Sequence, residues 1–400
     1  MEYPGMTRYP IDSKSHALTK LKNSAECIQK KTVFIATAAI SEDMLFINGL
    51  YQNVYLIYRL FESMGWNSVL IVNNKTGVKV PKFMEDMKIK VVEEIVNNPI
   101  SVNLYIEIGM SLESAVRRFF KRCGAKIVKL YLGNILNIDI ETPVFMPGMS
   151  FAHHVIGDID YIWTSPHYYQ HVQYSLVINQ IPLSKREDCI APYVWDPQIL
   201  ENDGARHYEW REAKEEKEDV FLLLEPNISF QKCSLIPLLM IERWYRENKS
   251  WNGRVIFVNG DRLLLIPFFK KLYDSLELVK DRKVEIKPRM SILQLLENYP
   301  SAIPVCHQVN NEYNYMVLEY FWTGFPVLHN SSDWKECGYY YSENNIKEGV
   351  DLINKIRRNH VSNFQTYKSH GKALAWHHSP YNPENHRCWE TLLKGCGIDA

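Results

Sequence analysis

A repeated alternation of short apolar runs with helix-spaced segments is the feature that most constrains the fold. The runs of the first series are TVFIATAAI (32–40), NSVLIV (67–72), VNLYIEIG (102–109) and AKIVKLYLGN (125–134). Each is short and apolar enough to form a buried strand. Between the first two lies YQNVYLIYRLFESMG, whose apolar residues have helical spacing. Strand, helix and strand in this order predict right-handed βαβ units in a parallel sheet.

The same alternation restarts in the second half of the chain, after a stretch that is almost wholly polar. The new runs are VFLLLEP (220–226), GRVIFVNG (253–260), VEIKP (284–288), SAIPVCH (301–307) and FPVLHN (325–330). Two tandem α/β domains of the Rossmann-like, doubly wound type are predicted, facing a central cleft at the carboxyl ends of their sheets. We expect a leader (1–30), a first domain (31–200), a polar linker (201–218), a second domain (219–365) and C-terminal helices packing back on the first domain (366–400).

Composition narrows the class of protein. Lys+Arg and Asp+Glu both number 46, so no net charge favours nucleic acid or an anionic membrane, and we expect no nucleic-acid partner. The 8 cysteines are scattered without a CxxC pair, which predicts reduced thiols and no zinc site. The polar, proline-broken N-terminus is unlike a signal peptide, and no apolar run approaches the ~18 residues of a membrane span. A cytoplasmic protein without a transmembrane segment is predicted.

The most informative stretch is HQVNNEYNYMVLEYFWTGFPVLHN (307–330), where a strand ends, a helix begins and a Gly-x-Pro turn follows. It resembles the C-terminal domain of retaining GT-B glycosyltransferases related to glycogen and sucrose synthases, which carry two glutamates seven residues apart. Glu319 matches the second glutamate. Glu312 is one residue too close to be the first, and Asn311 stands at the expected spacing. The resemblance implies a catalytic, sugar-contacting role for Glu312 and donor binding by Glu319.

The same stretch can be interpreted without the resemblance. A helix that begins near Glu312 would point its free N–H groups at a diphosphate, so the backbone from Asn311 through Tyr313, Asn314 and Tyr315 is predicted to bind the donor. Glu319, two turns further, would accept hydrogen bonds from ribose hydroxyls. The alternative is that Glu312 and Glu319 are both solvated helix residues.

The turn LLLEPNISFQKCS (222–234) supplies a second set of candidates. In the resembled family this turn carries a basic pair that neutralises the donor diphosphate; Lys232 fits one position, and the region of Glu225 and Asn227 occupies the other. One lysine together with helix N–H groups could stabilise a departing diphosphate without a metal. Lys232 could equally be an ordinary exposed lysine.

Candidates in the first half are fewer. Gly49, Gln52 and Asn53 follow the first strand, where GT-B enzymes approach the donor phosphates and the acceptor, although Gln52 and Asn53 could simply cap a helix. The resemblance implies a residue that touches the transferred sugar; His154 is the candidate and Asn134 its rival.

His167 and His171 have the i, i+4 spacing of metal ligands. They lack an acidic or cysteine partner nearby in sequence, and no metal site is expected.

Together EPNIS, NYMVLEYFWTGFPVLHNS and GYYY resemble a little-characterised glycosyltransferase-like group of bacteria and large DNA viruses. The predicted function is a metal-independent, cofactor-free hexosyl- or pentosyltransferase, retaining in outcome. It would move sugar from a nucleotide-diphosphate sugar to a glycan or glycoprotein acceptor, in the host cytoplasm if viral. A nucleotide-sugar epimerase of the same fold and an inactive nucleotide-sugar-binding protein remain alternatives.

Overall fold

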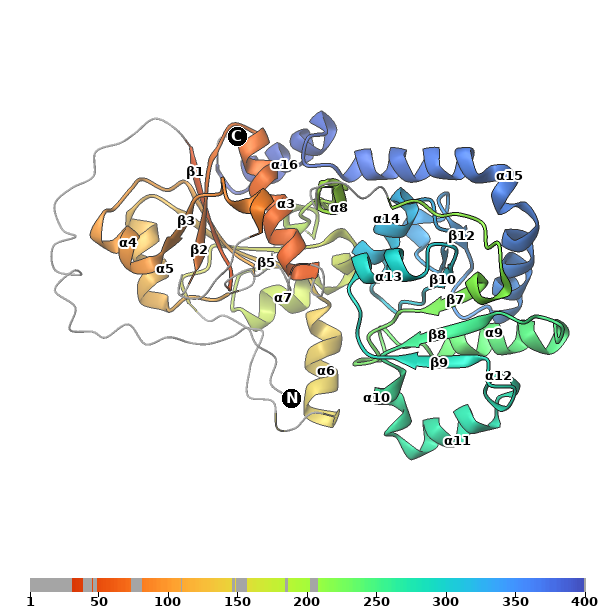
Figure 1. Cartoon of the computed structure of the whole chain (residues 1–400). Helices are drawn as coiled ribbons and strands as arrows, with labels where there is room; N and C mark the ends of the chain where they lie inside the picture. Colours follow the sequence, from red (N-terminus) through yellow and green to blue (C-terminus); the bar gives the residue numbers. More distant parts are fainter. Residues whose placement is uncertain are drawn as a thin grey trace. The chain divides into compact units, whose positions relative to one another are not determined.

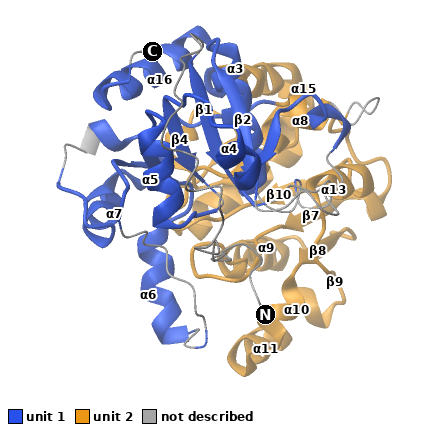
Figure 2. Ribbon diagram, turned by 90° about the vertical axis from the view of Figure 1, so that its left-hand side faces the viewer, with its two compact units in different colours: residues 1–196, 377–400 blue, residues 197–376 orange. Residues whose placement is uncertain are grey.

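The computed structural model describes residues 31–38, 45, 49–72, 81–108, 110–145, 148, 157–183, 186–201 and 208–398. The chain divides into two compact units (Figure 2): unit 1 is Met1–Asp196 with His377–Ala400, and unit 2 is Pro197–Trp376. Each unit is built on one sheet, and the elements are labelled in Figure 1.

The sheet of unit 1 has six strands in the order β3-β2-β1-β4-β5-β6, and every neighbouring pair is parallel. Strands β1 and β4 at its centre are buried along their whole length, as expected for a sheet with helices on both faces. The strands are β1 (Thr32–Ala36), β2 (Asn67–Val72), β3 (Ile89–Val91), β4 (Leu104–Glu107), β5 (Lys126–Tyr131) and β6 (Tyr161–Thr164). The helices are α3 (Gly49–Ser63), α4 (Val92–Asn97), α5 (Ser114–Arg122), α6 (Ile135–Phe145), α7 (Val172–Ile178) and α16 (Pro383–Gly395).

Unit 2 repeats this arrangement with the order β12-β11-β10-β7-β8-β9, again with all neighbours parallel. Its strands are β7 (Val220–Leu223), β8 (Arg254–Val258), β9 (Val284–Lys287), β10 (Ile303–Val305), β11 (Leu328–His329) and β12 (Tyr339–Tyr340). Its helices are α8 (Gln198–Glu201), α9 (Leu235–Glu247), α10 (Gly260–Leu264), α11 (Pro267–Ser275), α12 (Glu277–Lys280), α13 (Ile292–Asn298) and α14 (Tyr315–Trp322). The long α15 (Ile346–His378) ends the unit.

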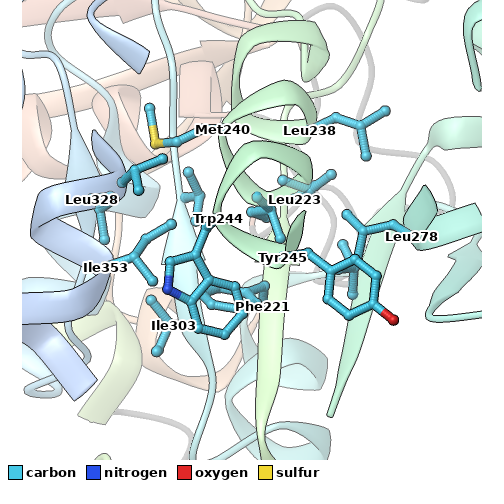
Figure 3. Packing of buried hydrophobic residues seen from close by; sticks show 14 of the residues in the cluster. Phe221, Leu223, Leu238, Met240, Trp244, Tyr245, Leu278, Ile303, Leu328 and Ile353 are labelled. Carbon is cyan, nitrogen blue, oxygen red and sulfur yellow. The ribbon is translucent and has the colours of Figure 1, made fainter. Parts of the chain in front are cut away.

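Aromatic packing fixes α9 on the unit 2 sheet (Figure 3). Trp244 of α9 lies edge-on to Phe221 of β7, with 5.2 Å between ring centroids, and Trp251 lies 5.5 Å from Trp244. Both indoles also keep a polar partner: Trp244 donates to Asn354 of α15 and Trp251 to Asp219. Large buried aromatic surfaces whose N–H groups are satisfied stabilise the packing of α9 on the sheet.

The sequence-predicted strands and helices differ from the structure at three places. The run CIAPYVWDP (189–197), whose apolar residues also predict a strand, is irregular, with only a bridge between Ile190 and Thr164. The segment 263–276, whose spacing predicts one helix, is divided between α10 and α11, because Pro267 starts a new helix. The helix predicted to begin near Glu312 begins at Tyr315. The other predicted apolar runs form strands of the two sheets over at least part of their length.

The polar stretch before β7 lies in unit 2 where the structure describes it. The backbone N–H of Trp210 donates to Thr323 O and that of Arg211 to Pro300 O, at 2.9 and 3.0 Å. The Trp210 indole lies 4.5 Å from the His360 ring. Residues 208–211 are therefore held on the unit by hydrogen bonds and ring contacts.

Within the described ranges, no helix is long and apolar enough to cross a membrane. The seven cysteines in those ranges are all free thiols.

Candidate functional site

Strand order reverses between β7 and β10 of unit 2. These two strands pair in parallel, with Val305 opposite Leu223. The sheet continues from β7 through β8 and β9, and from β10 through β11 and β12. Ligands of doubly wound sheets bind outside the carboxyl ends of the strands at such a reversal, so the segments leaving β7 and β10 form the candidate site.

Glu225 lies two residues beyond β7, and its carboxylate is buried. One oxygen accepts a hydrogen bond from the backbone N–H of His307 at 3.0 Å, and the other accepts one from the side-chain amide of Gln308. Burial raises the pKa of Glu225 to about 7, although the His307 N–H, the Lys232 ammonium and the Gln308 amide each act to lower it. The cost of burying the charged form thus outweighs the hydrogen bonds from two neutral donors and the attraction of Lys232.

Lys232 is carried by a tight turn in the β7–α9 segment. The N–H of Asn227 donates to Lys232 O at 3.1 Å, and the N–H of Lys232 donates to Ser229 O at 3.2 Å. Burial lowers the pKa of Lys232, the Glu225 carboxylate raises it, and the Arg289 guanidinium lowers it. Lys232 therefore lies within electrostatic range of one carboxyl group and a second cation, and it is not simply a solvated surface lysine.

Arg289 is a residue that the sequence prediction missed. It follows β9 by two residues, at the same edge of the sheet as Lys232. The available signal was its position just after the run VEIKP. With Lys232 it provides two positive charges where a phosphate-bearing ligand would bind.

Asn227 supports the turn that leads into α9. Its backbone is left-handed, with φ of 55°, and its Oδ1 accepts a hydrogen bond from the N–H of Ser234 at 2.8 Å. Its Nδ2 donates to the carbonyls of Val258 and Asn259 after β8. The predicted donor-binding residue thus joins the segments after β7 and β8.

Hydrogen bonds join the segment after β10 to the segment after β11. The N–H of Gln308 donates to Asn330 Oδ1 at 2.9 Å, and Asn330 Nδ2 donates to Gln308 O at 2.7 Å. Asn311 Nδ2 donates to Gln308 Oε1 at 2.8 Å. A continuous chain of hydrogen bonds therefore runs from Glu225 through Gln308 to Asn311.

Helix α14 starts later than the sequence pattern predicts, which corrects the interpretation of Glu312. Asn314 is the N-cap, and its side chain accepts a hydrogen bond from the N–H of Met316 at 3.1 Å. Glu312 precedes the helix, so it does not share a helical face with Glu319. Its carbonyl accepts a hydrogen bond from the Ser331 hydroxyl at 2.6 Å. Burial, and then the Asp333 carboxylate, raise the pKa of Glu312.

Tyr313 and Tyr315 lie on either side of the N-cap. The Tyr313 ring stacks on Trp334 with 5.0 Å between centroids and 11° between planes. Tyr315 is the first residue of α14 and is buried; burial raises its pKa well above the ordinary value, with a further contribution from Glu319.

Glu319 itself is buried in the second turn of α14. It is 3% exposed, so the alternative that Glu319 is a solvated helix residue is wrong.

In unit 1, the described candidate residues lie at or near the starts of two helices, and one of them, Asn134, caps its helix. Gly49 is the first residue of α3, and Asn53 Nδ2 donates to Gly49 O at 2.8 Å. Gln52 is buried in the same helix. Asn134 precedes α6, and its Oδ1 accepts a hydrogen bond from the N–H of Asn137 at 3.1 Å. His154 lies outside the described residues.

The two histidines with metal-ligand spacing do not lie on one α-helical face. Residues Pro166–His171 form a 3-10 helix with a kink at Tyr168, and α7 begins only at Val172. The His167 and His171 rings both pack against Tyr168, at centroid distances of 3.8 and 6.3 Å.

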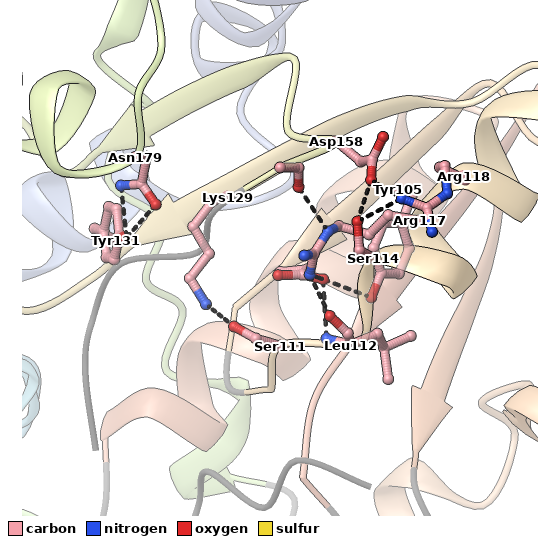
Figure 4. A network of polar contacts seen from close by, with 12 residues as sticks. Tyr105, Ser111, Leu112, Ser114, Arg117, Arg118, Lys129, Tyr131, Asp158 and Asn179 are labelled. Atoms are coloured by element: carbon pink, nitrogen blue, oxygen red, sulfur yellow. Dashed lines mark hydrogen bonds and ion pairs between the residues drawn. The ribbon is translucent and has the colours of Figure 1, made fainter. Parts of the chain in front are cut away.

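Unit 1 also holds a buried charged cluster that sequence analysis did not identify (Figure 4). Glu107 ends β4, and its Oε1 accepts hydrogen bonds from the N–H of Leu112 at 3.0 Å and the Tyr105 hydroxyl at 3.2 Å. The Arg117 guanidinium lies 3.3 Å from the same oxygen. Lys129 faces Glu107 in the register of β4 and β5 and donates to the Ser111 hydroxyl at 2.8 Å.

Several solved glycosyltransferase structures are similar to this chain. A glycosyltransferase from Rickettsia africae shares 14% identity at a TM-score of 0.53, covering 92% of this chain and 100% of that one. The α,α-trehalose 6-phosphate synthase from Burkholderia multivorans shares 9% at 0.55, covering 92% and 99%. An α-glucosyltransferase in complex with UDP and a DNA that contains an HMU base shares 9% at 0.55, covering 92% and 100%. These likenesses and the two doubly wound sheets confirm the predicted GT-B fold.

Residues 33–393 match the model of the family described as "Protein of unknown function (DUF2827)". No curated protein matches the chain.

Proposed function

The chain belongs to the family described as "Protein of unknown function (DUF2827)", and we propose that it is a glycosyltransferase that moves a sugar from a nucleoside-diphosphate sugar to a glycan or glycoconjugate acceptor. The observation that carries this proposal is the position of Lys232 after β7, at the strand-order reversal of unit 2, with the Arg289 guanidinium after β9 close enough to lower the Lys232 pKa. The GT-B fold alone would not carry it, since one fold supports several activities.

The chemistry of the leaving group explains why cations are needed there. When the bond to the sugar breaks, negative charge builds on the nucleoside diphosphate, and preorganised positive groups stabilise that charge. Burial lowers the pKa of Lys232, and a bound diphosphate would favour its charged form. Two cations at one edge suffice for a transfer in which the diphosphate leaves without a metal ion.

Glu225 has a supporting role in this mechanism. Its pKa of about 7 allows the carboxyl to be protonated when a diphosphate approaches, which relieves repulsion between the two anions. The ionised carboxyl would attract Lys232 in the empty site. Its hydrogen bonds to His307 and Gln308 position the segment after β10.

Asn311 and Glu319 are proposed to contact the donor. Gln308 holds the Asn311 amide, at the position where the resembled family has its sugar-contacting glutamate. We assign Glu319 to the ribose and a retaining outcome to the reaction, as the family resemblance implies. UDP-sugars are the first donors to test, since one similar structure contains UDP.

A nucleotide-sugar-binding protein without turnover is the second candidate function. The neutral Asn311 in place of a carboxylate favours it, because an amide cannot offer the charge that a glutamate offers to a developing positive centre. The acceptor class also remains open, and nucleic acid belongs among the acceptors tested, given the DNA in one similar structure.

The test is a thermal-shift screen with UDP-, GDP-, ADP- and dTDP-sugars, followed by measurement of released nucleoside diphosphate. We expect one donor to raise the melting temperature and to be slowly hydrolysed, with Lys232→Met losing both effects. Lys355→Met is the matched control, since Lys355 is an exposed lysine on α15 of the same unit. A shift without release of diphosphate would favour the binding protein, and no shift with any donor would overturn the donor-site assignment.

A further inference from the structure

The turn between α10 and α11 exposes a continuous apolar tip, Leu265–Pro267 with Phe268. Leu265 is 81% exposed, Ile266 53% and Phe268 75%. Large apolar residues exposed side by side are uncommon on proteins that meet only water, and they mark interaction surfaces. Both views place α10 and α11 at the margin of unit 2, beyond β9 (Figures 1 and 2).

The tip is anchored by a buried neighbour although its own side chains are exposed. Phe269, the neighbour of Phe268, is buried in the core of unit 2 and lies 6.3 Å from Phe257 of β8. Pro267 occupies the first turn of α11, where its fixed φ stabilises the helix start. Consecutive helix residues point about 100° apart, so burial of Phe269 directs Phe268 away from the core.

The charges around the tip indicate what covers it. The sequence DRLLLIPFFKK places Asp261 and Arg262 before the apolar residues and Lys270 and Lys271 after them. Lys270 pairs with Asp274 at 2.6 Å, while Lys271 is exposed. The flanks thus hold three cations against two carboxylates, and an apolar tip with this excess of positive charge is complementary to a bilayer that has anionic headgroups above an apolar interior.

The exposed apolar residues of α6 offer a contrast. Ile140, Val144 and Phe145 are exposed there, but the helix sequence ILNIDIETPVF contains Asp139 and Glu141 and no lysine or arginine. Acidic flanks would be repelled by an anionic bilayer. The α10–α11 tip differs from α6 in combining exposed apolar side chains with flanking positive charge.

We propose that the α10–α11 tip docks unit 2 on an anionic lipid bilayer, with Leu265, Ile266 and Phe268 inserted and Lys271 among the headgroups. Helix α10 begins two residues after β8, and Asn227 ties that junction to the turn bearing Lys232. Five helical residues span about 7.5 Å, so docking would bring the candidate site close to the membrane surface. The bilayer-binding inference does not depend on sugar transfer.

The experiment is co-sedimentation of the full chain with vesicles of phosphatidylcholine alone and of phosphatidylcholine mixed with phosphatidylglycerol, without donor or acceptor. We expect binding to the anionic vesicles only. The double variant Ile266→Ser with Phe268→Ser should weaken it at least about tenfold, and Lys271→Glu about fivefold. Since all three side chains are exposed, melting temperatures should stay at the wild-type value, which verifies folding.

Matched controls come from α15, where Val361 and Trp376 are exposed apolar residues and Lys355 is an exposed lysine. Val361→Ser with Trp376→Ser, and Lys355→Glu, should bind the vesicles like wild type. Equal binding by the tip variant and its control would overturn the proposal, as would absence of wild-type binding. If the tip variant and wild type differed in oligomeric mass in solution without vesicles, the tip would be assigned to contact between copies of the chain instead.

No nucleotide-sugar is present in this measurement. The bilayer proposal and the transferase proposal can therefore be refuted independently of each other. A chain that binds vesicles without transferring sugar would still support docking, and one that transfers sugar but ignores vesicles would refute docking alone.

Discussion

Both units place a carboxylate and a lysine at the carboxyl edge of a parallel sheet, but they satisfy the carboxylate differently. In unit 1, Glu107 accepts from Leu112 and Tyr105 and is 3.3 Å from Arg117. In unit 2, Glu225 receives only the uncharged donors of His307 and Gln308. A buried carboxylate that is paired with a cation stabilises one arrangement of the chain. A buried carboxylate that is held by neutral donors can instead exchange its proton near pH 7. The comparison separates a structural cluster in unit 1 from a chemically responsive one in unit 2.

The largest expected effect tests the structural side of this comparison. Arg117→Met should lower the free energy of unfolding by about 3–5 kcal/mol, because it leaves the Glu107 carboxylate buried without its cation. Urea unfolding followed by circular dichroism measures this change. The control is Arg118→Met on the same helix, whose exposed ion pair with Asp158 should contribute under about 1 kcal/mol. Similar losses of unfolding free energy in the two variants would mean that the pairing of Arg117 with Glu107 does not stabilise the fold more than a surface ion pair does.

A second prediction concerns the pH response of Glu225. Its folded-state pKa of about 7 lies above the ordinary value of 4.5, so its contribution to stability is fully present below pH 4.5 and is lost as pH rises through 7. Relative to Glu225→Gln, wild type should therefore lose roughly 1–3 kcal/mol of unfolding free energy between these limits.

The measurement is urea unfolding of both proteins at several pH values, taken as a difference. Buried histidines titrate in the opposite sense: burial lowers the pKa of His360 to about 4, so its neutral form stabilises the fold as pH rises. The difference curve cancels that contribution, since both proteins keep His360. A flat difference curve would contradict the assignment of Glu225 as the group that titrates near neutrality.

The central strands of both sheets could be predicted from sequence because burial on two faces demands uninterrupted apolar runs. The edge strands β3 and β12 were not predicted, since they are only three and two residues long. The start of α14 was misplaced because several residues before it can cap a helix, and only the structure identifies Asn314. Local propensity does not choose among neighbouring candidates when tertiary contacts such as that between Ser331 and Glu312 fix the chain.

The buried charges were missed for a different reason. Glu107 and Lys129 interrupt the runs VNLYIEIG and AKIVKLYLGN, and a charge inside a buried strand is itself a signal. Their pairing, however, depends on the register that sets Glu107 opposite Lys129, and Arg289 approaches Lys232 only through the strand order of unit 2. Neither register nor strand order can be deduced from one sequence.

The smallest expected effect on stability gives the sharpest test of the comparison. Burial lowers the pKa of both Lys129 and Lys232, so replacing either ammonium with methionine removes a desolvation cost along with its favourable contacts. Each variant should stay within about 1 kcal/mol of wild type in urea unfolding. The functional consequences should nevertheless differ: Lys232→Met loses the donor-induced rise in melting temperature, and Lys129→Met keeps it. If the donor response survived in Lys232→Met but disappeared in Lys129→Met, the buried cluster of unit 1 would be the phosphate-binding one, and the roles assigned to the two units would have to be exchanged.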